Sequence, residues 1–121
     1  VTPGPTGAPL VVAFRLAGVD FLALNGGPNF KFTEAISLTI DCRSQAEVDD
    51  YWEKLSAGGQ TSACGWLKDK YGLSWQVTPD VLPRLLNDPD RAKAGRAFQA
   101  MLTMTKIDVA AIEAAAAAEP K

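Results

Sequence analysis

Residues 64–79 read CGWLKDKYGLSWQVTP, and this stretch predicts a β-hairpin. Trp66 and Leu67 belong to a first short strand, and the polar turn that follows contains Gly72, which supplies the positive φ of a tight reversal. The second strand alternates, with Leu73, Trp75 and Val77 on one face and Ser74, Gln76 and Thr78 on the other. Pro79 ends the strand because proline has no N–H to donate to a ladder. The apolar face should pack on helices, so the polar face either meets solvent or lines a cleft.

The chain before this hairpin predicts three more strands. Residues 10–16 and 19–24 are apolar runs separated by Ala17-Gly18, which is typical of a hairpin. The sequence NGGP at 25–28 stops the second of them. Residues 35–42 alternate again, with Ile36, Leu38, Ile40 and Cys42 on one face and Ser37, Thr39 and Asp41 on the other.

Helices are predicted on both sides of the central hairpin. Ser44 and Glu47 have the spacing of a capping box, and Gly58-Gly59 closes the helix that they begin. A short helix follows over residues 80–87, and Pro83 is compatible with it only in the first turn. Further helices are expected from Asp88-Pro89 to about Met104, and from Asp108 through Ala118.

Four motifs together resemble one known family. They are LNGGP at 24–28, AIS at 35–37, EVDDYW at 47–52 and CGWLKDKYGLSWQ at 64–76. The chain resembles PhnB-like proteins over residues 10–112. These form a branch of the vicinal-oxygen-chelate (glyoxalase/bleomycin-resistance) superfamily that is often called 3-demethylubiquinone 3-methyltransferase-like. The resemblance implies an α+β fold with a mixed sheet of βαβββ modules around a cleft, a truncated first module and a C-terminal helical tail.

The resemblance also implies a division of the chain. We expect a single vicinal-oxygen-chelate-like domain over residues 1–121, with a Pro/Gly-rich flexible arm (1–9), a remnant of the first module (10–34), the second module (35–79) and the helical tail (80–121). Proteins of this family begin with a strand, a helix and a further strand that are not found here, and a partner chain could fill that gap by swapping. The family resemblance and the sheet edge that the incomplete first module leaves exposed together predict a homodimer.

Composition excludes several classes of function. The formal net charge is −2 and the 12 Lys and Arg residues are scattered, so we expect no nucleic-acid partner. No apolar run reaches the roughly 18–20 residues that cross a bilayer, so we expect no membrane segment. Cys42 and Cys64 are too few for a disulfide framework and indicate reduced thiols in a cytoplasmic protein.

The absence of histidine from the sequence bears on catalysis and on metal binding. It removes the commonest general base and the commonest transition-metal ligand. In metal-dependent members of the superfamily, Ala35 would stand at a histidine position and Gln76 at a glutamate position. The sequence therefore predicts no metal, no other cofactor and no assignable catalytic residue. A methyltransferase would need a Gly-rich turn that opens a helix, and NGGP opens none.

Candidate ligand-binding residues come from the polar sides of two strands and from one aromatic side chain. They are Ser37, Thr39, Trp66, Ser74 and Gln76. Three hydroxyls, an amide and an indole suit a small molecule, although alternation alone also produces solvated polar faces. Three functions stay open: a metal-free small-molecule-binding protein, an enzyme of the same superfamily (lyase-, dioxygenase- or transferase-like) with unknown substrate, and a structural or partner-binding module that uses the helical tail.

Overall fold

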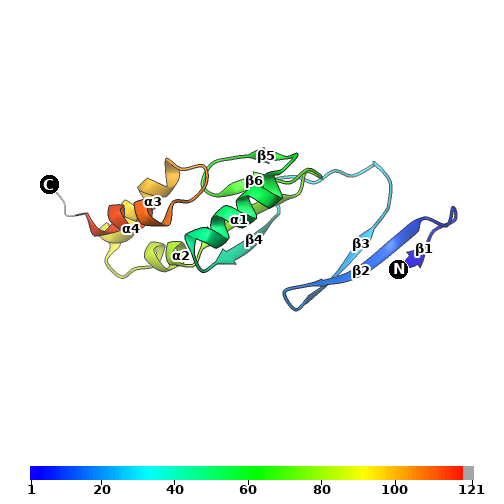
Figure 1. The fold of residues 1–121 in the computed structure, drawn as a ribbon, viewed down its shortest axis with the longest axis horizontal. Helices are drawn as coiled ribbons and strands as arrows, with labels where there is room; N and C mark the ends of the chain where they lie inside the picture. The colour runs from blue at the N-terminus through cyan, green and yellow to red at the C-terminus, as the bar shows by residue number, and fades with distance from the viewer. Residues whose placement is uncertain (119–121) are drawn as a thin grey trace. The chain divides into compact units, whose positions relative to one another are not determined.

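The computed structural model describes residues 1–118, which form two compact units, one over Val1–Lys31 and the other from Phe32 onward. Figure 1 labels their helices and strands apart from β7. The expected helical tail includes residues 119–121, and these lie outside the described residues.

The first unit is a three-stranded antiparallel sheet. It contains β1 (Thr2–Pro3), β2 (Pro9–Leu16) and β3 (Val19–Leu24), in the order β1-β2-β3. The expected hairpin of β2 and β3 is confirmed: Leu16 pairs with Val19, and the turn residues Ala17 and Gly18 both have positive φ (49° and 80°). Such a turn matches the right-handed twist of the strands that it joins.

The second unit is built on a four-stranded mixed sheet. Its strands are β4 (Ser37–Cys42), β5 (Gln60–Thr61), β6 (Trp66–Lys68) and β7 (Ser74–Pro79), in the order β4-β7-β6-β5. β4 runs parallel to β7, and the other neighbours are antiparallel. Helix α1 (Gln45–Ser56) lies between β4 and β5 in the chain, so residues 37–79 make a βαβββ module. The sequence predicted the other strands and the helix of this module but not β5, which is only two residues long.

Helix α1 begins as expected at Ser44, but its cap differs from a capping box. The Ser44 hydroxyl accepts the Glu47 N–H at 3.2 Å, whereas the Glu47 carboxylate accepts the N–H of Arg43 at 2.9 Å and not that of Ser44. The return bond is therefore displaced by one residue. At the other end of α1, Gly58 has φ +75° and the N–H of Gly59 donates to the Ser56 carbonyl at 2.8 Å.

One apolar cluster joins α1 to the sheet. Its buried members are Cys42, Val48, Leu67 and Val77, and the partly buried Ile40, Trp52, Leu55 and Trp75 pack against it. Trp75 and Val77 therefore lie on the helix-covered side of the sheet, as expected for the apolar face of the hairpin. Because Val77 and Trp75 alternate with Ser74 and Gln76 along β7, the latter two lie on the face opposite α1.

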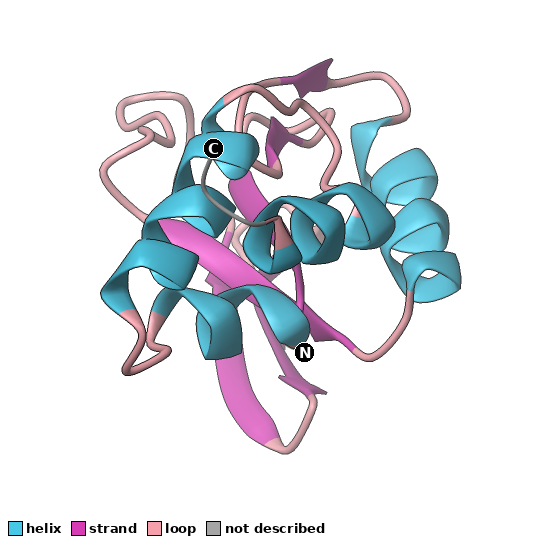
Figure 2. Cartoon of the chain, turned by 90° about the vertical axis from the view of Figure 1, so that its left-hand side faces the viewer, coloured by secondary structure: helices cyan, strands magenta, loops and turns pink. Residues whose placement is uncertain are grey.

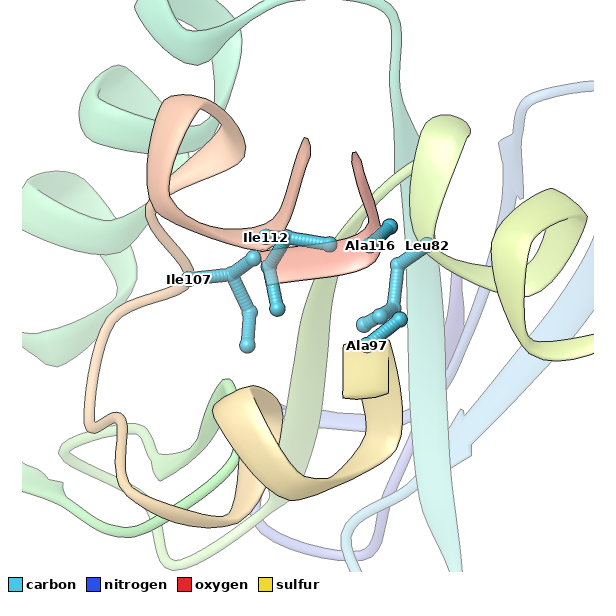
Figure 3. Close-up of a cluster of buried hydrophobic side chains, with 5 residues drawn as sticks. All are labelled: Leu82, Ala97, Ile107, Ile112 and Ala116. Atoms are coloured by element: carbon cyan, nitrogen blue, oxygen red, sulfur yellow. The ribbon is translucent and has the colours of Figure 1, made fainter. Parts of the chain in front are cut away.

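The C-terminal helices form a second cluster. Helices α2 (Val81–Leu86), α3 (Arg91–Leu102) and α4 (Val109–Ala117) pack on one another, as Figure 2 also shows. The buried members of this cluster, drawn in Figure 3, are Leu82, Ala97, Ile112 and Ala116 from the helices and Ile107 from the segment between α3 and α4. Pro83 lies in the first turn of α2, the one part of the helix in which a proline was expected to be compatible.

The predicted start of α3 was wrong by a few residues. Asp90 caps the helix, since its Oδ1 accepts the N–H groups of Ala92 and Lys93 at 3.1 and 3.2 Å. The Asp88 carboxylate instead accepts the N–H of Asp90 at 2.8 Å. Both aspartates fit a helix start by residue type, and only the local turn selects the second.

Polar contacts hold the helical segment against the βαβββ module. The Gln45 side chain donates to the Ile107 carbonyl at 3.0 Å and accepts the Val109 N–H at 2.7 Å. The Lys106 ammonium lies 2.8 Å from the Asp49 carboxylate. This ion pair and the Gln45 amide lower the pKa of Asp49 below its ordinary value of 3.8.

Candidate functional site

All five predicted ligand-binding residues lie on one face of the second unit's sheet. Strand register places Ser37 beside Ser74 and Thr39 beside Gln76, and Trp66 pairs with Gln76 from the other side. Residues paired in register share a face. We call this face, opposite α1 and made of Ser37, Thr39, Trp66, Lys68, Ser74 and Gln76, the polar face.

A pocket of about 340 Å³ opens at the β5–β6 end of the second unit's sheet. Its lining residues are Glu34, Gln60, Thr61, Ser62, Trp66, Leu67, Lys68 and Ser74. Two of the five predicted residues, Trp66 and Ser74, therefore line the pocket. The other three, Ser37, Thr39 and Gln76, are not among its lining residues. The pocket thus takes in the part of the polar face beside β5 and β6.

Gln76 and Ser37 bind each other. The Gln76 side-chain amide donates to the Ser37 hydroxyl at 2.9 Å. This contact joins β7 to β4 across the polar face and occupies one donor of the amide. Thr39, the neighbour of Gln76 in the ladder, is exposed.

Ser74 is the polar residue in the pocket wall with the least exposure to solvent. Only 1% of its surface is exposed, and its hydroxyl has no hydrogen-bond partner among residues 1–118. A buried hydroxyl without a partner costs about 1–3 kcal/mol, so such groups are rare in folded proteins. Because Ser74 lines the pocket, a molecule bound there would lie beside this unused hydroxyl.

The charged groups of the pocket form an ion pair. The Lys68 ammonium contacts the Glu34 carboxylate, and the two side chains are 39% and 63% exposed. The hydrogen bond from Lys68, assisted by a backbone N–H and by the charge of Lys68, holds the pKa of Glu34 below its ordinary value of 4.5. Lys68 also pairs in register with Ser74, so the ammonium and the buried hydroxyl belong to neighbouring residues of the polar face.

The sequence-based list did not include Glu34, Gln60 or Lys68. A signal for Lys68 was present, because it follows Trp66 by two residues and therefore shares its face. Gln60 lies in the two-residue β5, which pairs in register with Lys68. Glu34 lies in the irregular segment before β4, where no periodic pattern reports the direction of a side chain.

Neither cysteine has the surroundings of an activated nucleophile. Both are free thiols in this structure. Burial, with smaller contributions from Glu47, Asp41 and Asp80, raises the pKa of Cys42 to about 11, so this thiol is protonated at neutral pH. Cys64 is half-buried and has φ +60°, and its N–H donates to the Met104 carbonyl at 2.8 Å.

The structure adds two findings on metal sites and membrane segments. Within residues 1–118, no three His, Cys, Asp or Glu side chains come together as a metal site. In the same residues, no helix is long and apolar enough to cross a membrane.

The βαβββ order of residues 37–79, with one helix-covered face and one polar face, is that of a PhnB-like protein with a glyoxalase-type fold. The family model for 3-demethylubiquinone-9 3-methyltransferases matches residues 1–78, and the chain belongs to this family. The matched residues include the whole pocket. The resemblance drawn from the four sequence motifs is thereby confirmed.

A solved structure supports the same assignment. The chain is 34% identical to the PhnB protein from Bacillus cereus, with a TM-score of 0.54. The match covers 58% of this chain and 64% of the Bacillus cereus chain, so this chain matches less than two thirds of that protein's length. Comparison with curated proteins found no match.

Proposed function

We propose that this protein binds a small molecule in the pocket between β5, β6 and β7, without a metal. The observation that carries this proposal is the buried Ser74 hydroxyl in the pocket wall, which has no partner within residues 1–118. Trp66 supplies an aromatic surface in the same wall. Ser37, Thr39 and Gln76 continue the polar face beside it and would meet the parts of a ligand that extend beyond the pocket.

The dimensions and chemistry of the pocket support binding. Its volume of about 340 Å³ lies at the lower end of the range of roughly 300–1,000 Å³ that is usual for small-molecule sites. Its lining contains one indole, one apolar side chain and one ion pair. Four neutral polar side chains complete it, Ser74 and three others. Such a mixture can orient a small, partly polar ligand.

The charges around the pocket support a metal-free site. The one carboxylate among the described lining residues, that of Glu34, is already bound to the Lys68 ammonium, so it is not free to bind a divalent cation. Gln76, at the position where metal-dependent relatives carry a glutamate, is neutral and already bound to Ser37. Neutral amide and hydroxyl groups alone bind divalent ions weakly.

The test is native mass spectrometry of the full chain purified without added ligand, with elemental analysis of the same sample. We expect a retained small molecule in the wild type, its loss in Ser74→Ala and Trp66→Ala, and its retention in Ser56→Ala, a half-buried serine at the end of α1 that does not line the pocket. Stoichiometric zinc, nickel, manganese or iron would contradict the metal-free site. Equal ligand retention in all four proteins would contradict the pocket.

We also propose that the protein is a homodimer, on the basis of apolar side chains exposed in the first unit. Leu22 and Leu24, which share one face of β3, are 74% and 68% exposed. Among the described residues, every buried hydrophobic side chain belongs to the second unit. A small sheet without buried side chains of its own needs a cover, and a second copy of the chain is the cover that we propose.

Light scattering after size-exclusion chromatography tests the dimer. Leu22→Glu should give a monomer or a much weaker dimer. Leu102→Glu, at an exposed leucine of α3, should leave the dimer unchanged. The opposite result would place the interaction surface on the helical tail.

A cytoplasmic location is proposed from the thiols. Both cysteines are free, and one of them is buried. The cytoplasm keeps thiols reduced, whereas secreted domains of this size commonly use disulfides. Fractionation of cells that produce the protein tests this location.

A further inference from the structure

We infer that the pocket takes a small carboxylate, which binds Lys68 and Ser74 in place of the Glu34 side chain. The inference rests on the proposed function, since it names the chemical class of the ligand for the same pocket. It assigns Glu34 a second role as an internal competitor. The ion pair, the buried hydroxyl and the segment that carries Glu34 each support it.

The first step is the identity of the group that now contacts Lys68. The Lys68 ammonium lines the pocket and contacts the Glu34 carboxylate, which lines it as well. Lys68, the cationic residue among the described pocket residues, therefore already binds one carboxylate. A ligand carboxylate has the same charge and geometry and can take the same place.

The second step is the unused hydroxyl. Ser74 pairs with Lys68 in the β6–β7 ladder, and its hydroxyl has no partner among the described residues. Glu34 satisfies Lys68 and leaves Ser74 unbound. A ligand carboxylate has two oxygens, so one can accept from Lys68 and the other from the Ser74 hydroxyl. The ligand would thus satisfy both groups, whereas Glu34 satisfies one.

The third step is the ease of displacing Glu34. Its side chain is 63% exposed, and it lies in an irregular segment before β4 rather than within the sheet. Exposed ion pairs contribute little to stability, and a released Glu34 carboxylate is readily hydrated. Exchange of one carboxylate for another therefore costs little.

The fourth step selects a carboxylate over a phosphate. The pocket offers one ammonium and one free hydroxyl, which match a single negative charge. Phosphate groups carry nearly two charges at neutral pH and are usually held by several cationic or N–H donors. Trp66 in the wall further favours a planar or aromatic body attached to the carboxylate.

The test is an NMR titration of the ¹⁵N-labelled full chain with benzoate and acetate, and with benzamide as the neutral analogue of benzoate, at constant ionic strength. We expect benzoate to bind the wild type and to shift the signals of Lys68 and Ser74. Glu34→Gln should bind benzoate about two- to fivefold more tightly, because it removes a competitor held by an exposed ion pair. Lys68→Met, which keeps the apolar stem, should bind it at least about tenfold more weakly.

Helix α1 offers matched controls on the opposite side of the sheet. Lys54 and Asp50 form an exposed ion pair 3.0 Å long that does not line the pocket. Lys54→Met and Asp50→Asn make the same chemical changes as the two pocket variants and should leave the affinity for benzoate unchanged.

The outcomes separate the inference from the proposed function. If benzamide binds the pocket as tightly as benzoate, and Glu34→Gln changes neither affinity, the carboxylate inference is wrong and the binding function stands. If neither carboxylate shifts Lys68 or Ser74 in Glu34→Gln, the inference is wrong as well. If the wild-type protein retains no small molecule in the mass-spectrometry experiment and binds none of the three compounds, the proposed binding function itself is wrong.

Discussion

The indole Nε1 of Trp75 donates a 2.9 Å hydrogen bond to Oδ2 of Asp69. The other oxygen of this carboxylate accepts the N–H groups of Tyr71 and Leu73, at 2.8 and 3.1 Å. One side chain therefore shapes the turn between β6 and β7 and fixes a core tryptophan. The two strands that it joins carry Trp66, Lys68 and Ser74 into the pocket.

Asp69→Ala should destabilise the protein by about 2–3 kcal/mol, because it removes the acceptor of three hydrogen bonds and leaves the indole N–H unpaired. Urea unfolding followed by circular dichroism measures this change. Asp50→Ala is the control, since its exposed ion pair with Lys54 should contribute less than about 1 kcal/mol. Similar losses in both variants would contradict the role of Asp69.

Ser74→Ala should stabilise the unliganded protein by about 1 kcal/mol, because it removes a buried hydroxyl that lacks a partner. The same change should weaken ligand retention. Thermal unfolding with and without ligand measures both effects. A variant that is less stable and still retains the ligand would show that the hydroxyl serves the fold and not the pocket.

Gly59→Ala should be strongly destabilising. A Cβ at this position would lie 2.1 Å from the Lys68 carbonyl oxygen, so the segment that leads into β5 and the end of β6 would have to separate. We expect a loss of at least about 3 kcal/mol by urea unfolding, in the range of severe overpacking. Gly95→Ala is the matched control: Gly95 lies within α3, its Cβ would meet nothing within 4 Å, and the change should stabilise by about 0.5–1 kcal/mol.

Stability should fall at alkaline pH through Cys42. Burial raises the pKa of this thiol from its ordinary value of 9.0 to about 11 in the folded protein. The folded state then holds a proton that the unfolded state releases, so the contribution is complete below pH 9 and decreases between pH 9 and 11. At about 1.4 kcal/mol per pH unit, the loss is roughly 2–3 kcal/mol by pH 11.

Urea unfolding at several alkaline pH values checks this dependence. Tyrosine and lysine residues also titrate in this range, so Cys42→Ala is compared with the wild type at each pH. The difference in unfolding free energy between the two proteins should shrink as the pH rises from 9 to 11. A constant difference would show that Cys42 does not ionise on unfolding.

The elements that could be predicted from the sequence are those whose signals are local. Alternation along β7 predicts that Ser74 and Gln76 lie opposite the core, and Ser44 predicts the start of α1. Two-residue β5 has too short a pattern to be recognised, and it exists because Gly59 allows a close approach to β6. Asp88 and Asp90 are equivalent by residue type, so only the three-dimensional turn decides which of them caps α3.

The candidate site was predicted in part for the same reason. Trp66 and Ser74 line the pocket, and their faces follow from strand parity. Glu34 reaches the pocket from an irregular segment through its contact with Lys68, a residue far from it in the sequence. No periodic pattern reports such a contact, because it depends on the register between segments that are distant in the chain.

The turn that leads into β6 has a consequence for the order of assembly. Cys64 and Gly65 donate their N–H groups to the carbonyls of Met104 and Thr105, both at 2.8 Å, and Gly65 has φ +82°. During synthesis, these donors leave the ribosome long before their acceptors do. The entrance to β6, and with it the wall that carries Trp66, is therefore completed only after α3 has been made. A nascent chain that stops before Met104 has the strands of the pocket but not the anchor that holds them.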